Sequence, residues 1–293
     1  MANRRVLVKR RKAVRNIRKI TRTMQLIATA RFQAALRRAT ASRPYTQKLA
    51  ELVTDLSGAV AGVEHLLLKP APDARRAILV VLTSRRGFCG AYNANVLRMA
   101  LAHARQQSAA GAAPEVYMVG RKGINYYRFL RQPMARQFAD LSDTPRFSEI
   151  EPLANDLMEQ FANGGVASVD VAYMRFLSAA QQRAMVLPLL PLSRTGVGDA
   201  AVASRRSRPE YDFSPSPQAI LDELLPASVR VKLFQCFVES NVSEQIARMV
   251  AMKAATDSAG DMITLLTQRY NRARQTHITM ELLDIVGGAN ALQ

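Results

Sequence analysis

Apolar residues recur at alternating steps of four and three near the start of the chain, which is the spacing of a heptad repeat. The positions that carry this seam are Ala13, Ile17, Ile20, Met24, Ile27, Arg31 and Ala34. Good helix formers dominate residues 10–39, and the first proline is Pro44. The pattern predicts one long helix over residues 1–58 whose seam packs against a second helix.

A second heptad pattern lies close to the other end of the chain. Its positions are Ile263, Leu266, Tyr270, Ala273, His277 and Met280. No proline interrupts residues 231–286, and a helix of that length would extend about 80 Å at about 1.5 Å per residue. A helix this long needs a partner along its length or projects into another molecule. We therefore expect residues 218–293 to pack antiparallel against the N-terminal helix as a coiled coil.

Residues 75–192, between the two heptad patterns, alternate strand-like with helix-like segments. Strands are expected at residues 77–83, 115–119, 169–177 and 183–189, and helices at 93–107, 123–130 and 147–162. This alternation favours a Rossmann-like α/β domain with parallel strand pairs. The fold class predicted is α/β, with a long antiparallel coiled coil of the N- and C-terminal helices plus this central domain. Residues 193–217, rich in Gly, Ser and Pro, are predicted to be a linker.

Charge is distributed very unevenly along the chain. The first fifty residues contain fifteen Lys or Arg and no Asp or Glu, so they account for all but +3 of the net charge of +18. This asymmetry indicates that the N-terminal helix meets an acidic partner. Arg-rich, acid-free ends are also typical of organelle transit peptides. Here the heptad pattern continues to residues 43–45 without a Ser-rich cleavage region, which argues against that alternative.

Composition also argues against several other classes of protein. The sequence contains no run of about 18 apolar residues, so no direct membrane insertion is expected. The two cysteines, Cys89 and Cys236, have no companion Cys or His at the spacing of metal ligands. We therefore expect neither a disulfide framework nor a zinc site, and a reducing compartment fits.

Motifs for catalysis or cofactor binding are also missing from the sequence. Residues 87–90 lie between a predicted strand and a predicted helix but do not form G-x-G-x-x-G. Residues 120–123 lack the spacing and the Lys-Ser/Thr pair of a phosphate loop. Cys89 precedes a predicted helix, which can lower a thiol pKa, yet no base accompanies it. Surface or packing roles are expected for the scattered histidines: His65, His103 and His277. We expect no catalytic residue, no cofactor and no metal, and a structural turn at residues 83–93.

Several segments resemble the gamma subunit of F-type ATP synthases, and together they extend from one end of the chain to the other. The C-terminal segments that carry the resemblance are residues 247–257, 270–275, 278–282 and 285–292. Further matches are residues 17–24, 42–45, 83–93 and 120–123. The chain departs from the family at a few positions. Arg22 and Arg31 stand where Lys is usual, Leu26 where Met is common, and Phe32 replaces an aliphatic residue.

The resemblance implies a non-catalytic rotor shaft without a cofactor. Its terminal helices would lie inside a hexamer of alpha and beta subunits, and its α/β domain would bind the epsilon subunit and the c-subunit ring. The implied location is peripheral, at the cytoplasmic face of a bacterial cell membrane. By resemblance, the contacts with the alpha/beta head fall on Arg22, Met24, Arg274, Gln275, Thr279 and Glu281.

Two other functions remain as alternatives at this point. The first is a basic, helical nucleic-acid-binding protein, which the isoelectric point of 10.7 would suit. Aromatic residues make up only 6% of the chain, Trp is absent, and no nucleic-acid reader motif occurs. The second alternative is an α/β dehydrogenase with helical extensions, which lacks its glycine motif. Salt-dependent DNA binding would reveal the first function and nicotinamide binding the second.

Overall fold

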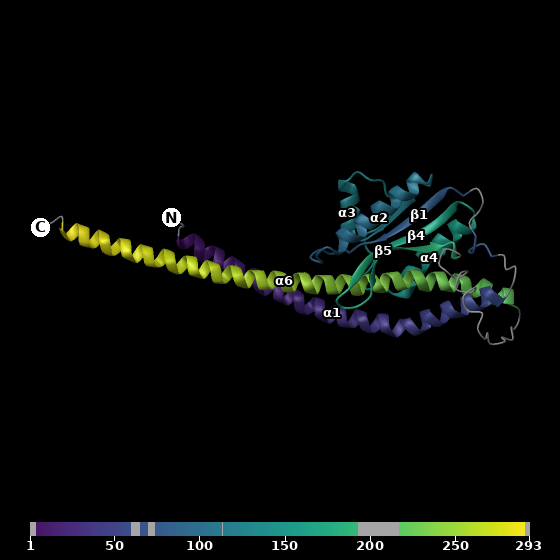
Figure 1. Ribbon diagram of the computed structural model, residues 1–293, viewed down its shortest axis with the longest axis horizontal. Coiled ribbons are helices and arrows are strands. Elements are labelled where there is room, and N and C mark those ends of the chain that lie inside the picture. Colours follow the sequence, from purple (N-terminus) through teal and green to yellow (C-terminus); the bar gives the residue numbers. More distant parts are fainter. Residues whose placement is uncertain (1–3, 60–64, 70–73, 113, 193–216, 291–293) are drawn as a thin grey trace. The chain divides into compact units, whose positions relative to one another are not determined.

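The computed structural model describes residues 4–59, 65–69, 74–112, 114–192 and 217–290. It divides into two units, one formed by residues 1–29 with 248–293 and the other by residues 30–247. Two long helices contribute to both units: α1, Arg4–Ala59, and α6, Pro217–Asn290 (Figure 1). The predicted linker lies outside the described residues up to residue 216, and Pro217 is already the first residue of α6.

A five-stranded sheet forms the centre of the second unit. Its strand order is β3-β2-β1-β4-β5. The bounds are β1 Arg76–Leu82, β2 Pro114–Val119, β3 Arg136–Phe138, β4 Val166–Phe176 and β5 Gln182–Leu190. The first four strands in this order pair in parallel, and β5 pairs antiparallel with β4. The prediction of a Rossmann-like α/β domain is confirmed. Strand β3 was not predicted, because three residues are too few to show a period.

Helices cover both faces of this sheet. They are α2, Tyr92–Ala109, α3, Arg121–Phe129, and α4, Phe147–Ala162 (Figure 1). Helices α2 and α3 pack on one face, while α4 and the first part of α6 pack on the other. Because side chains alternate along a strand, β1 supplies Leu79 and Val81 to the first core and Ile78 and Val80 to the second. Burial on both faces explains why β1 is a continuous apolar run.

Two glycines after β2 permit a close approach to Thr83, which follows β1. Thr83 Oγ1 donates a hydrogen bond to the carbonyl oxygen of Val119 at 2.6 Å and accepts one from the Gly123 amide at 3.0 Å. A Cβ on Gly123 would lie 2.6 Å from Thr83 Oγ1, and Gly120 has a φ of +92°. Both positions therefore need glycine for packing and backbone conformation. These contacts explain the glycines of residues 120–123 without any bound phosphate.

Both cysteines are buried free thiols. The Asn93 amide donates to Cys89 Sγ at 3.2 Å, and burial raises the pKa of the Cys236 thiol. Within the described residues, no three His, Cys, Asp or Glu side chains gather as metal ligands. Among the described helices, none combines the length and apolar character that crossing a membrane requires.

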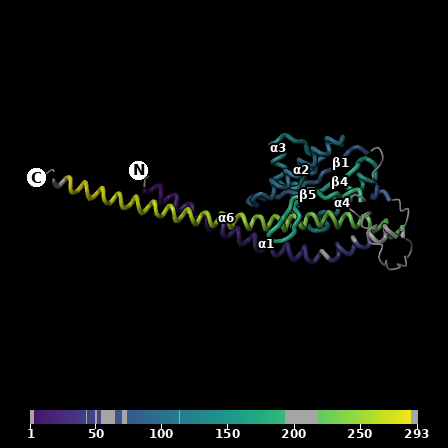
Figure 2. The backbone as a smooth tube through the Cα atoms, viewed as in Figure 1, coloured from purple at the N-terminus to yellow at the C-terminus, as the bar shows by residue number. Residues whose placement is uncertain are grey.

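In the first unit, α1 and α6 form an antiparallel pair. The hydroxyl oxygens of Thr21 and Thr256 lie 2.8 Å apart, and the guanidinium of Arg11 lies 5.0 Å from the ring centre of Tyr270. Residues with lower numbers on α1 therefore contact residues with higher numbers on α6, which is the arrangement of antiparallel helices. Figure 2 shows the two helices running alongside each other and α6 continuing past the first described residue of α1. The predicted antiparallel coiled coil is confirmed.

The seam of α1 lies one residue away from the predicted one. Buried positions in this unit are Leu7, Thr21 and Ala28, whereas Ile17, Ile20 and Ile27 are 51%, 59% and 51% exposed. The reason is the size of the facing side chains: Thr256, Ala259 and Gly260 approach α1, so small residues allow a short distance between the helix axes. In the second unit, Ala35 and Ala39 continue the heptad spacing of Thr21 and Ala28 and pack against Val242.

The seam predicted on α6 is correct over its first part only. Leu266 is buried, and Ile263, Tyr270 and Ala273 are partly buried. His277 and Met280 are exposed, so their assignment to the seam was wrong. The antiparallel pairing brings Thr21 to Thr256, and only seventeen described residues of α1 precede Thr21. Residues of α6 beyond about Ala273 therefore extend past the described part of α1.

The observed seam can be tested by disulfide formation. Replacing Thr21 and Thr256 together by Cys should give a disulfide within the chain under mild oxidation, because their side chains already touch. The matched control, Ile20→Cys with Thr256→Cys, should remain reduced, since Ile20 faces away from the pair. Electrophoresis without reductant distinguishes the two products. Efficient crosslinking of the Ile20 pair with none for the Thr21 pair would restore the seam predicted from sequence.

The close approach at Gly123 predicts a large effect from one methyl group. Gly123→Ala should lower the free energy of unfolding by about 1–3 kcal/mol, because the methyl group overlaps Thr83 and Met118. Gly287→Ala is the control, since no atom lies within 4 Å of its Cβ position and alanine favours helix by about 1 kcal/mol. Urea denaturation measures both. Equal stability of the two variants would contradict the packing role of Gly123.

Candidate interaction surface of the terminal helices

The outward face of α1 in the first unit is both aliphatic and basic. This face carries an aliphatic row, defined as Ile17, Ile20 and Ile27, with Leu26 beside it. Each of these four side chains is more than half exposed. The exposed charged side chains around this row are Lys12, Arg15, Lys19 and Arg22, and residues 4–29 include no Asp or Glu. Large exposed aliphatic side chains on one face mark an interaction site in soluble proteins. The accompanying charge selects for a partner that carries acidic groups.

A second exposed apolar region lies at the end of α6. From Arg274 to Gly287, every side chain is exposed. This terminal segment carries six large apolar side chains that are 44% to 68% exposed: Ile278, Met280, Leu282, Leu283, Ile285 and Val286. A single helix with so much exposed apolar surface is suited to insertion into an apolar pocket or sleeve of another molecule.

The six predicted contact residues fall into two groups. Arg22 donates a hydrogen bond to Gln25 Oε1 at 3.1 Å, and Met24 is partly buried, so both belong to the level of the Thr21–Thr256 contact. Arg274 follows Thr256 by eighteen residues, or about 27 Å at about 1.5 Å per residue. The structure therefore does not bring the six residues together, and they mark two separate regions of the helix pair.

The second group lies on the terminal segment of α6. Arg274 and Gln275 are exposed, and Thr279 Oγ1 donates back to the carbonyl oxygen of Gln275 at 3.1 Å. Glu281 lies 3.5 Å from His277 Nε2 one turn before it. Among the described residues, no carboxylate lies within 4 Å of Arg22 or Arg274. Both guanidinium groups are thus available for charge-assisted hydrogen bonds to another molecule.

Sequence reasoning missed the exposed aliphatic residues of this surface. Ile17, Ile20 and Ile27 were placed inside the seam, although a heptad spacing also fits Leu7, Val14, Thr21 and Ala28, which are seven residues apart. The larger side chains were preferred, and they proved to be the outward ones. The small residues in the second series were the available signal, because helices that approach closely need them at the contact. The surface contains groups for binding and offers no nucleophile paired with a base.

Comparison with known proteins gives full-length relatives. The chain matches the family model described as ATP synthase over residues 3–292. It is 43% identical to the ATP synthase gamma chain of Rhodopirellula baltica, with all of both chains covered. It is 37% identical to the ATP synthase gamma chain of Leptospira biflexa, again over all of both chains.

Solved structures share the fold at low sequence identity. A rotor chain of the Euglena gracilis mitochondrial ATP synthase is 16% identical, with a TM-score of 0.63, and the match covers 94% of this chain and 98% of that one. A chain from the central stalk and c-ring of the Tetrahymena thermophila enzyme is 20% identical, with a TM-score of 0.57 and coverage of 80% and 99%. The resemblance inferred from the terminal motifs is confirmed. With the family model and these full-length relatives in agreement, the chain belongs to the ATP synthase gamma-chain family.

Proposed function

We propose that this chain is the central rotor shaft of an F-type ATP synthase. It couples ion flow through a membrane c ring to ATP synthesis or hydrolysis in an alpha/beta hexamer by rotating. The observation that carries the proposal is the helix pair of the first unit, which buries its own small-residue seam and leaves aliphatic and basic side chains outward. Full-length similarity to gamma chains favours this function over nucleic-acid binding.

The terminal helices provide two contact regions for the alpha and beta subunits. One is the aliphatic row with Arg22 and Met24, and the other is the terminal segment of α6 with Arg274, Gln275, Thr279 and Glu281. The acid-free charge of α1 suits acidic loops on the beta subunits. The apolar end of α6 suits an apolar sleeve formed by the hexamer, because its large aliphatic side chains have no partner on the described part of α1.

Rotation of an asymmetric shaft changes what each catalytic subunit touches. At the level of Thr256 the shaft is a pair of helices with one basic face, whereas beyond Ala273 the described part of α1 no longer accompanies α6. A beta subunit therefore meets a different surface at each angle, and its conformational equilibrium shifts according to which surface it binds better. The chain supplies contacts and rigidity, and the chemistry of ATP belongs to the hexamer.

The α/β domain is proposed to bind the epsilon subunit and the c ring. Of the relatives with the same fold, one belongs to a structure of a central stalk with its c-ring. This arrangement gives the chain a peripheral position at the cytoplasmic face of a bacterial cell membrane, reached through the ring. The absence of a membrane-spanning helix among the described ones is compatible with that position.

A paired substitution on α6 tests the contact with the head. Replacing Arg274 and Gln275 together by Ala should lower the ratio of protons pumped to ATP hydrolysed, because two side chains that bind the hexamer are lost. Each hydrogen bond to a charged group is worth about 1.5–3 kcal/mol, so an effect of about tenfold or more on the coupled rate is expected. The measurement is ATP-driven acidification of membrane vesicles alongside ATP hydrolysis.

The control uses the same two residue types one and a half turns earlier. Gln268 and Arg269 are exposed on α6, and their double Ala variant should pump as the unaltered complex does. Subunit content of the purified complexes shows whether each variant assembles. A fully assembled Arg274 and Gln275 variant with unaltered pumping would remove these residues from the contact surface.

A further inference from the structure

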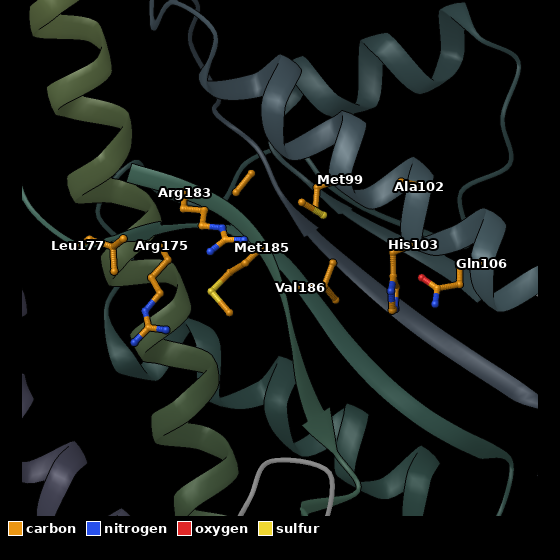
Figure 3. A pocket seen from close by; sticks show the side chains of 10 residues that line it. Met99, Ala102, His103, Gln106, Arg175, Leu177, Arg183, Met185 and Val186 are labelled. Atoms are coloured by element: carbon orange, nitrogen blue, oxygen red, sulfur yellow. The ribbon is translucent and has the colours of Figure 1, made fainter. Parts of the chain in front are cut away.

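An open groove of about 500 Å³ lies on the α/β domain between α2 and the edge strand β5 (Figure 3). From α2 it is lined by Met99, Ala102, His103 and Gln106, which share one face of the helix at spacings of three, one and three. In Figure 3 these side chains stand on one side of the groove, and those of β5 stand on the other. All residues that line the groove belong to the second unit.

The lining from β5 shows that the groove follows the free edge of the sheet. Four consecutive residues, 183–186, line it. Successive side chains of a strand point to opposite faces, so four in a row can line one groove only where the groove runs along the strand edge. Within the described part of the chain, β5 pairs only with β4. Its outer edge therefore presents peptide N–H and C=O groups, a template for one more strand.

Two arginines of the hairpin give this edge its charge. Arg175 of β4 and Arg183 of β5 are directly opposite in the antiparallel ladder, both are exposed, and both line the groove. No carboxylate of the described residues lies within 4 Å of either guanidinium. Like charges directly opposite each other destabilise a strand pair. An acidic group placed beside them would relieve that repulsion.

Neighbouring residues supply no such acidic group. Helix α2 contains no Asp or Glu. The carboxylate of Asp170 is 1% exposed, with Oδ2 at 3.0 Å from His103 Nε2 and 2.6 Å from Gln107 Nε2. Asp170 is thus held beneath α2 by those two side chains. Since no carboxylate of the described residues lies within 4 Å of Arg175 or Arg183, an acidic group of a partner protein is able to pair with them.

Apolar side chains complete an alternating pattern along the strand. Met185 stands two residues after Arg183, on the same face of β5, and Met99 and Leu177 are exposed in the same groove. Pro188 has no N–H to offer, so strand addition is confined to the part of β5 before it. A segment that fits this edge carries an acidic residue and, two positions away, an apolar one.

We propose that β5 binds an extended acidic segment of a partner protein, which adds a sixth strand to the sheet. An Asp or Glu of that segment lies opposite Arg183, and an apolar side chain lies opposite Met185. Main-chain hydrogen bonds along β5 provide affinity, and the two arginines select for acid. This binding site is independent of the contacts proposed for the terminal helices.

Synthetic peptides test the site on the full-length chain. The probe is a short fluorescein-labelled peptide with the repeat Glu-Thr-Val-Thr, which places a Val two positions from each Glu, and its counterpart has Lys in place of Glu. A third peptide keeps the sequence with Glu but carries N-methyl groups on alternate backbone amides. Fluorescence anisotropy measures binding. We expect the Glu peptide to bind about tenfold more tightly than the Lys peptide, and N-methylation to abolish binding, because an added strand needs its N–H groups.

Charge reversal on the protein provides the matched comparison. Arg183→Glu should reverse the preference so that the Lys peptide binds more tightly, a gain that a misfolded variant could not produce. Arg105→Glu, the same change at an exposed position of α2 outside the groove, should leave both affinities unaltered. Equal binding of the Glu and Lys peptides, indifference to N-methylation, or equal effects of the two reversals would each overturn the proposal.

Discussion

Close packing of small side chains between α1 and α6 is the contact on which the terminal helix pair depends. Thr21, Ala28, Thr256 and Ala259 are buried there, and the two threonine hydroxyls touch across the helices. Side chains this small allow a short distance between the helix axes. With these positions in the seam, Ile17, Ile20 and Ile27 lie on the outer surface of the pair.

This constraint connects the stability of the shaft with its proposed function. A pair that satisfies its own seam stays together without a third molecule, so the outward aliphatic and basic residues are available to the hexamer. Past Ala273 the described part of α1 no longer accompanies α6, and the apolar side chains of the terminal segment have no partner within the pair. Apolar surface in two regions, about 27 Å apart along the helix, suits a shaft that contacts a surrounding ring at more than one level.

The sequence predicted the elements well, because their periods are strong. The bounds of α4 were predicted without error, and β1 was recognised from its unbroken run of Ile, Leu and Val. The face of α1 could not be predicted from period alone, since two adjacent series share the same steps and differ only in residue size. The free edge of β5 and the opposition of Arg175 to Arg183 depend on strand pairing, which spacing along the chain does not encode.

The six contact residues stay a prediction, and the structure adds where they lie along the helix pair. Arg22 and Arg274 were named together because the family motifs contain them, yet they belong to separate levels of the helix pair. Hydroxyl-radical footprinting of the free chain and of the assembled complex tests this arrangement most directly. We expect Ile17, Ile20 and Leu282 to be oxidised in the free chain and protected in the complex, and Leu266 to be protected in both. Oxidation of Leu266 in the free chain, or aliphatic residues that stay equally reactive after assembly, would contradict it.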